Sequence, residues 1–270
     1  MTAYLGNPGS LVRVECPSVQ SKDSQRPARY LNTIGGTTFA QVGPRTKRSW
    51  EVRLPATSTP AEVATWQAFV EGEFGLGPWW FVPEVAATTN VMSARGSVLD
   101  TGVVQSGSSV NGGPFTLPDG QVAGRSWLVG PANVFLPWVD GLQYTPVVPG
   151  VPVTGSVFVQ GAGARFRLRF YAADGSISRT IGDAYASGSQ AQRLVLSATP
   201  QQGEALCLLM VDSAQCRVAR PAISWTDSVR PWSVGAGAPA VHVAGYSEDV
   251  TLAVPGREMV GVSLTVQEVG

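Results

Sequence analysis

The sequence has little charge, a single histidine and few cysteines, and each shortage argues against a class of function. Only 14% of its 270 residues are charged, and 19 basic side chains balance 19 acidic ones. Because nucleic-acid binders normally carry a basic surplus or stripe, we expect no nucleic-acid partner. The longest hydrophobic run, residues 205–211, is too short to cross a bilayer, and residues 1–17 lack the apolar segment of a signal peptide. We therefore expect no membrane span and synthesis in a cytoplasm.

The side chains that catalyse hydrolysis are sparse. The one histidine, His242, stands in an alternating β segment, which favours a structural or surface role over a catalytic triad. A glycosidase needs two carboxylates that face one bond. The carboxylates available for such a pair stand in turns and polar loops, which favours solvated side chains: Asp174, Asp183, Glu204, Asp212 and Asp227. Loop 161–163 opens no helix, so it is no phosphate cradle. We expect no enzymatic activity and no cofactor.

The three cysteines are Cys16, Cys207 and Cys216, and an odd count argues against a disulfide framework. Cys207 and Cys216 flank an expected hairpin turn at 211–215 and could face each other across two strands. Buried thiols in a reducing compartment are the favoured interpretation. No run of residues has the spacing of a metal site.

What the sequence has in abundance is glycine (31) and proline (20), which with little helical patterning indicates a β-rich protein with many turns. One helix is expected over 59–72. Thr59 is a good N-cap, Pro60 suits the first helical position, and Glu62 completes a capping box. The apolar residues Val63, Trp66 and Val70 recur at helical spacing, with Phe69 beside them.

An aromatic strand follows this helix. Three large aromatic side chains in succession, residues 79–81, favour a strand buried on both faces over an exposed binding platform. Upstream, residues 48–54 alternate between apolar and charged side chains, as a strand with one buried face does. The aromatic residues expected in the core are Trp50, Trp66, Trp79, Trp80 and Phe81.

The rest of the sequence predicts β-structure in two regions. Residues 11–15 are expected to form a strand, 17–28 a polar loop and 30–42 a hairpin around Gly35-Gly36. From 90 to 231 we expect no helix but a series of short strands separated by turns, which predicts a β-sandwich. The clearest strand is 165–171, with its phenylalanines and leucine inward and its arginines outward.

The C-terminal strands suggest that the chain returns to its first domain. Residues 233–239 are expected to form a flexible linker. The alternating strands after it are too few to form a domain alone, so we expect them to complete the N-terminal sheet. The predicted domains are 1–88 plus 239–270, with 89–238 inserted between them.

Several separated blocks resemble minor tail proteins of long-tailed actinobacteriophages. These blocks are 29–31 with Gly35-Gly36, 40–42, 48–50, 77–83 with Asn90, 245–259 and 267–270. The resemblance implies a tail-tube-like or distal-tail-like antiparallel β-sandwich with one helix, which assembles as a ring around the tail axis. The virion tail tip is then the expected location.

The inserted part resembles the jelly-roll carbohydrate-binding modules of glycosidases, through residues 149–157, 165–175, 192–194, 199–200 and 219–225. Such modules hold sugars on exposed aromatic rings. The candidate glycan contacts are Trp127, Trp138, Tyr144, Tyr171 and Tyr185. Jelly rolls of this kind often hold a structural Ca²⁺, although this sequence has no dense oxygen-ligand motif.

Two readings of the function follow. In the first, the chain is a structural tail-tip subunit that forms a ring with itself, six copies being the first guess and three the alternative. Its other partners would be the tail tube, the tail hub and the tape measure, and its jelly roll would contact host cell-wall polysaccharide or be purely architectural. In the second, it is a stand-alone carbohydrate-binding protein or the binding part of a hydrolase.

Overall fold

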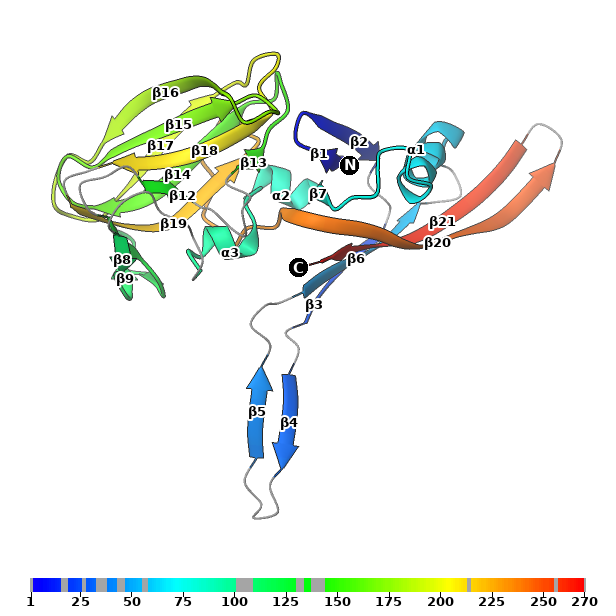
Figure 1. Cartoon of the computed structure of the whole chain (residues 1–270), viewed down its shortest axis with the longest axis horizontal. Coiled ribbons are helices and arrows are strands. Elements are labelled where there is room, and N and C mark those ends of the chain that lie inside the picture. The colour runs from blue at the N-terminus through cyan, green and yellow to red at the C-terminus, as the bar shows by residue number, and fades with distance from the viewer. Residues whose placement is uncertain are drawn as a thin grey trace. The chain divides into compact units, whose positions relative to one another are not determined.

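The structure is a computed structural model of the whole chain, shown in Figure 1, and it describes residues 2–15, 19–25, 28–32, 38–42, 47–54, 58–100, 109–129, 134–136, 144–212, 215–254 and 257–269. These residues form strands β1 to β21 and three helices, so the fold is mainly β, as predicted. No helix in the described ranges is long and apolar enough to span a membrane.

The chain divides into two compact units. Unit 1 comprises Met1–Ala3, Arg13–Trp79 and Pro239–Gly270, and unit 2 comprises Tyr4–Val12 and Trp80–Ala238. The division differs from the predicted boundaries, because residues 4–12 and 80–88 belong to unit 2. That unit 2 is an inserted domain remains a prediction.

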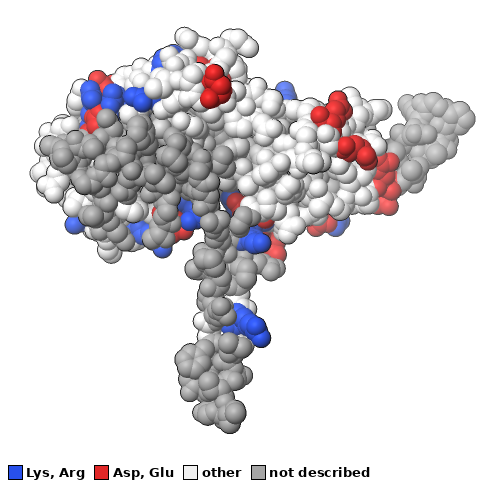
Figure 2. Space-filling model, in the orientation of Figure 1, with Lys and Arg blue, Asp and Glu red and all other residues white. Residues whose placement is uncertain are grey.

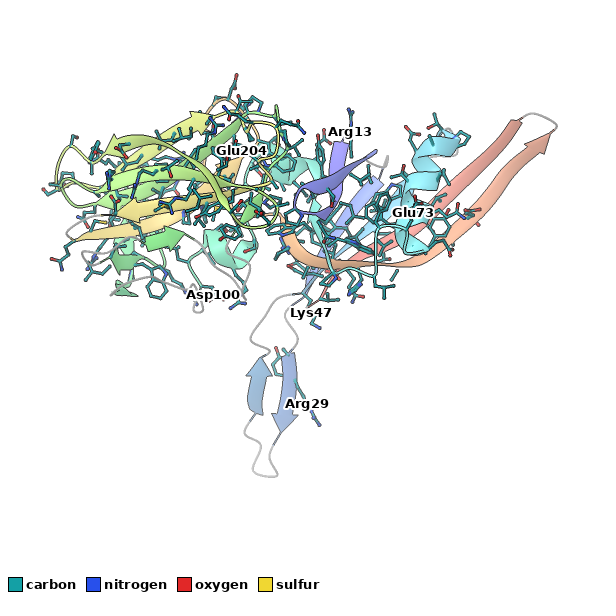
Figure 3. The ribbon with its side chains drawn as sticks, turned by 45° about the horizontal axis from the view of Figure 1, so that its top comes forward. Arg13, Arg29, Lys47, Glu73, Asp100 and Glu204 are labelled. Atoms are coloured by element: carbon teal, nitrogen blue, oxygen red, sulfur yellow. The ribbon has the colours of Figure 1, made fainter. Side chains whose placement is uncertain are left out.

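Unit 1 contains an antiparallel sheet in the order β20-β21-β6-β3 and a separate two-stranded pair, β4 and β5. The pair supplies the two strands of the predicted hairpin, whose turn at Gly35-Gly36 lies outside the described residues, and Arg29 on β4 is exposed (Figure 3). The elements of unit 1 are β3 (Val19–Gln25), β4 (Ala28–Asn32), β5 (Thr38–Val42), β6 (Lys47–Leu54), α1 (Pro60–Val70), β20 (Ala238–Val254) and β21 (Arg257–Glu268). Strand β3 corrects the expected loop over 17–28. The polar sequence does not predict this strand, which forms because β6 supplies its hydrogen-bonding partners.

Helix α1 begins as its sequence predicts. The Thr59 side chain accepts from the backbone N–H of Glu62, whose carboxylate accepts from the N–H of Thr59. The buried residues of the helix are Trp66 and Phe69, whereas Val70 is 36% exposed, so the expected stripe through Val70 is wrong. The T-shaped contact of Phe69 with Trp79, with ring centroids 5.3 Å apart, anchors this face.

A buried ion pair lies at one end of the unit 1 sheet. The guanidinium of Arg48 donates to both carboxylate oxygens of Glu268, through Nε at 2.9 Å and Nη2 at 2.8 Å. Arg48 is only 4% exposed and lies over the ring of Trp50, 5.3 Å from its centroid. Such a pair is costly to break, because a lone charge would remain in the interior.

Unit 2 is a sandwich of two antiparallel sheets around one core. One sheet has the order β17-β14-β19-β11-β8, and the other has β12-β18-β15-β16, with β13 paired to β18. Gly155 of β14 shows how closely they pack, because a Cβ there would lie 2.5 Å from Leu168 of β15 and 2.8 Å from Leu209 of β18. Residues 4–7 of β1, 10–12 of β2 and 80–82 of β7 also belong to this unit, and β1 pairs with β7.

Residues 90–231 form short strands, as expected, but Asp183, which was expected in a polar loop, lies on β16. The bounds of the remaining elements are β1 (Thr2–Asn7), β2 (Ser10–Glu15), β7 (Trp79–Val82), α2 (Glu84–Thr88), α3 (Ala94–Ser97), β8 (Ser109–Asn111), β9 (Phe115–Thr116), β10 (Val122–Ala123), β11 (Trp127–Val129), β12 (Val134–Leu136), β13 (Thr145–Pro146), β14 (Val153–Gln160), β15 (Arg165–Tyr171), β16 (Ile177–Tyr185), β17 (Gln192–Ala198), β18 (Leu206–Asp212) and β19 (Cys216–Ser224). The helices α2 and α3 were not predicted, because each spans barely one turn and shows no helical period.

The aromatic residues expected in the core are buried. Trp50, Trp66, Trp79, Trp80 and Phe81 are between 1% and 5% exposed, and all four residues of β7 are buried.

Of the two expectations for the cysteines, burial is confirmed and the pairing across a hairpin is wrong. Cys207 and Cys216 are buried thiols, as favoured, but they lie on β18 and β19, which belong to different sheets, so they do not face each other across a hairpin. Cys16 lies outside the described residues.

Residues 233–239 are ordered rather than a flexible linker. Ala236 and Gly237 donate backbone hydrogen bonds to the carbonyls of Asn90 and Met92, at 3.0 and 3.2 Å. A Cβ on Gly237 would lie 1.9 Å from the carbonyl oxygen of Val91, and one on Gly235 would lie 2.2 Å from that of Met92. The small residues that suggested flexibility are therefore required by close backbone packing.

Candidate functional site

One surface of unit 2 gathers three of the five predicted glycan contacts. Strand β15 alternates, so that Phe166, Leu168 and Phe170 are fully buried in the core while the intervening residues lie on the opposite face. We call this surface the β15 outer face. It comprises Arg165, Arg167, Arg169 and Tyr171 of β15, Asp183 and Tyr185 of β16, Asp212 of β18, and Tyr144.

Two arginines share one carboxylate at the end of this face. Arg165 donates to both oxygens of Asp212, at 2.8 and 2.6 Å, and Nη2 of Arg167 donates to the same carboxylate. Asp183 lies 3.8 Å from Arg165 and 3.9 Å from Arg167. The hydrogen bond from Arg165 and the charges of both arginines hold the pKa of Asp212 below its usual value, although its partial burial opposes them. Figure 2 shows basic and acidic atoms in contact over this part of unit 2.

Tyr185 is the exposed aromatic residue of this cluster. It pairs with Arg165 across the two strands, its hydroxyl donates to Asp183 at 3.3 Å, and 56% of the residue is exposed. An exposed ring beside fixed hydrogen-bond donors and acceptors is the arrangement that can stack on a sugar and bind its hydroxyl groups. This end of the face is the best candidate for ligand contact.

The other two tyrosines form a pair at the far end of β15. The rings of Tyr144 and Tyr171 lie 4.6 Å apart at a tilt of 48°. Tyr171 does point away from the core, as predicted, but it is only 5% exposed because Tyr144 and neighbouring apolar side chains cover it. Burial and the neighbouring Tyr171 raise the pKa of Tyr144. At about 3.4 Å per residue, this pair lies roughly 20 Å from Tyr185 along the strand.

The two tryptophan candidates do not join the β15 outer face. Trp127 lies on β11 of the opposite sheet, where its Nε1 donates to the carbonyl of Leu99 at 3.2 Å and its ring packs against the core. These contacts give Trp127 a structural role. Trp138 lies outside the described residues.

The carboxylates considered for glycosidase chemistry are mostly engaged elsewhere. Glu204 is 1% exposed and accepts from Arg179 at 2.7 and 3.0 Å, from Ser178 at 2.9 Å and from the Gln201 amide at 2.7 Å (Figure 3). Burial alone would raise the pKa of Glu204, but these hydrogen bonds outweigh it and lower that pKa. The expectation of solvated turn carboxylates is therefore wrong for Glu204 and Asp212.

The other turn carboxylates behave as expected. Asp174 and Asp227 are exposed, and Asp174 accepts from the backbone N–H of Ser176 at 2.8 Å in the turn between β15 and β16. The hydrogen bonds from the side chain and from the backbone N–H of Ser176 lower the pKa of Asp174. His242 lies beside Trp79, with ring centroids 6.2 Å apart, and next to Gly77. Among the described residues, no three His, Cys, Asp or Glu side chains are grouped as a metal site.

Sequence reasoning noticed the outward arginines of β15 but not their partners. Asp212 and Asp183 come from strands 45 and 16 residues away, so no local pattern joins them to Arg167. The signal that was present is the R-F-R-L-R-F-Y alternation itself. A row of arginines on one face of a strand favours acidic side chains on the adjacent strands.

No protein-family model and no curated protein matches the chain. It resembles the enzymatically active domain of tailspike protein 4 of bacteriophage CBA120, at 14% identity and a TM-score of 0.39 over 50% of this chain. It also resembles the CBM22-1 xylan-binding domain of a Paenibacillus barcinonensis protein, at 12% identity and a TM-score of 0.34 over 47% of this chain and 88% of that domain. The chain spans 21% of the tailspike domain's length. At these identities and TM-scores the matches carry no argument about function.

Proposed function

We propose that the chain is a structural subunit of a phage tail tip and that its unit 2 contacts glycan on the host surface. The proposal is carried by the agreement between two divisions of the chain, one by sequence resemblance and one into compact units. Most of the blocks that resemble minor tail proteins, among them 48–50 and 245–259, belong to unit 1, and those that resemble carbohydrate-binding modules, 149–157 and 165–175 among them, belong to unit 2.

The β15 outer face supports the glycan contact. It combines one exposed ring, Tyr185, with the hydrogen-bonding groups of Arg165 and Asp183 within reach of it. Salt bridges hold these polar side chains in place, so a sugar would meet groups that are already oriented. Binding of this kind needs no catalytic group.

In the tail, we propose that copies of unit 1 form a closed ring, with six copies as the first choice and three as the alternative. Contacts in a ring must run head to tail so that the ring closes. The neighbours would be the tail tube, the tail hub and the tape measure protein, and the virion tail tip would be the location.

A second candidate is a stand-alone carbohydrate-binding protein. It is favoured by the fact that every described candidate for glycan contact lies in unit 2, so that binding draws on no residue of unit 1. It leaves the chain segments of unit 1 without a role.

Two measurements on the full-length chain test the proposal. Light scattering with negative-stain images should reveal a ring with a central opening, whereas a monomer that still binds glycan would favour the second candidate. For the glycan contact, the protein should be retained by polysaccharide released from actinobacterial cell walls, and Tyr185→Ala should reduce that retention at least tenfold. Tyr30→Ala is the matched control, because Tyr30 is 69% exposed on β4. Equal loss in both variants would contradict a site at Tyr185.

A further inference from the structure

Strand β16 carries one extra residue where it passes the arginines of β15. Leu168 of β15 pairs with Ile181 of β16. The preceding inward residue of β15, Phe166, pairs with Ala184, so two steps along β15 match three steps along β16. This mismatch is a β-bulge, and Gly182 stands in it with φ at +45°, a conformation that glycine adopts readily.

The bulge brings Asp183 and Tyr185 together on the β15 outer face. Strict alternation from Ile181, which packs against the core, would turn residues 183 and 185 inward. With the extra residue, Ala184 packs against the core instead, and Tyr185 pairs with the outward Arg165. Asp183 and Tyr185 are both exposed. Because a bulge interrupts the ladder of hydrogen bonds, its effect here is to re-aim these two side chains toward solvent.

The two arginines nearest this site are bonded to a different carboxylate. Arg165 donates to both oxygens of Asp212, at 2.8 and 2.6 Å, and Arg167 donates to the same group. Together with Asp183, these four side chains carry two positive and two negative charges. The next basic residue of β15, Arg169, lies four positions from Arg165, about 14 Å along the strand. An anionic ligand would have to displace Asp212 from its arginines, so the site offers little to a charged sugar.

The carboxylate of Asp183 keeps room for further hydrogen bonds. It lies 3.8 Å from Arg165 and 3.9 Å from Arg167, which is longer than a hydrogen bond, and its side chain is 38% exposed. Within the described residues, the hydrogen bond that it accepts comes from the hydroxyl of Tyr185, at 3.3 Å. An ionised carboxylate has about four acceptor positions on its two oxygens. Two hydroxyl groups on neighbouring carbons of a sugar can therefore donate to it side by side, as the fork of an arginine does.

We infer that this end of the β15 outer face binds an uncharged sugar through two hydroxyl groups on neighbouring carbons. Both hydroxyls donate to the carboxylate of Asp183, and the ring of Tyr185 covers the apolar face of the same sugar. The inference rests on the proposed glycan contact of unit 2. It adds the ligand class, a neutral sugar with adjacent hydroxyls, and the residue that selects it.

The test uses the full-length chain and the polysaccharide released from actinobacterial cell walls. Periodate cleaves the bond between carbons that carry adjacent hydroxyls, so treated polysaccharide should retain the protein at least tenfold less than an untreated sample. Asp183→Asn, which removes one acceptor oxygen and the charge, should also reduce retention at least tenfold. Asp227→Asn is the matched control, because Asp227 is an exposed carboxylate of unit 2 outside this face.

Salt dependence tests the absence of charge on the ligand. Raising the salt concentration from about 0.1 M to about 1 M shortens the screening length from roughly 10 Å to roughly 3 Å, and retention should change less than twofold. Retention that survives periodate, that rises in Asp183→Asn or that falls tenfold with salt would each overturn the inference.

A stability readout separates ligand binding from a structural role for Asp183. Because Asp183 is exposed and makes no short contact with the arginines, Asp183→Asn should keep the thermal unfolding midpoint of the wild type, and a lowered midpoint would also overturn the inference. If Tyr185→Ala abolishes retention while periodate and Asp183→Asn leave it unchanged, the proposed glycan contact stands and the neutral-sugar ligand is rejected. No effect of Tyr185→Ala would instead refute the proposed site itself.

Discussion

Asn90→Ala should destabilise unit 2 by about 3–5 kcal/mol. Asn90 is fully buried, and its Oδ1 accepts from the backbone N–H groups of Met92 and Ile223, each at 3.2 Å. Its Nδ2 donates to the carbonyl of Ser233 at 2.9 Å and, at 3.5 Å, to that of Pro221. Alanine would remove this partner from the N–H groups of Met92 and Ile223 and from the Ser233 carbonyl, while the Pro221 carbonyl keeps its bond from Trp232 Nε1 at 3.2 Å. Each buried group left unpaired costs roughly 1–3 kcal/mol before any rescue by water.

The assay must report on unit 2 alone, because two units need not unfold together. Cys207 and Cys216 supply the probe, since both are buried in the core of unit 2. In a Cys16→Ser background, brief thiol labelling at increasing urea concentrations measures the unfolding of that core. Asn7→Ala is the control, because Asn7 is exposed. A loss below about 1 kcal/mol in Asn90→Ala would refute the reasoning.

Three further predictions concern single side chains. Trp80→Ala should cost about 3–5 kcal/mol in urea unfolding, because Trp80 is 5% exposed, while Val85→Ala at a 63% exposed site should change stability by less than about 0.5 kcal/mol. Because the folded chain lowers the pKa of Glu204 from its ordinary 4.5, the stability that this carboxylate contributes is present above that pH and is lost as pH falls through the lowered value. Urea midpoints measured from about pH 5 to about pH 3 should therefore fall less steeply in Glu204→Gln, and an equal slope would contradict this. Glu268→Gln should cost about 3–5 kcal/mol, because it removes the carboxylate charge that compensates the buried guanidinium of Arg48, and Glu51→Gln at an exposed pair is its control.

Local patterns predicted the elements whose causes are local. The capping box at Thr59, the alternation of 165–171 and the aromatic run at 79–81 each depend on neighbours within a few residues, and the structure has all three. The turns at Asp119-Gly120 and Asp174-Gly175 join β9 to β10 and β15 to β16. These features follow from backbone geometry and from the burial of apolar side chains.

The features that the sequence did not reveal depend on distant contacts. Residues 233–239 have the composition of a linker, and hydrogen bonds with residues 90–97, far earlier in the chain, make them ordered. The same holds for the polar strand β3, which needs β6, and for Cys207 and Cys216, which lie on opposite sheets. At the candidate site, the sequence identified Tyr185, whereas the acidic partners of Arg165, namely Asp183 and Asp212, are found only when the strands are paired.

Because unit 2 includes residues from the start of the chain, recombination could exchange this unit only within limits. Tyr4 packs edge-on against Trp225, with ring centroids 5.0 Å apart, and Val82 belongs to the core of the sandwich. A recombination event that replaced only the codons for 90–238 would separate these residues from the partners they evolved with. An exchanged unit 2 would therefore fold only if the first dozen codons were exchanged with it, or if the incoming domain could pack against the existing N-terminal strand.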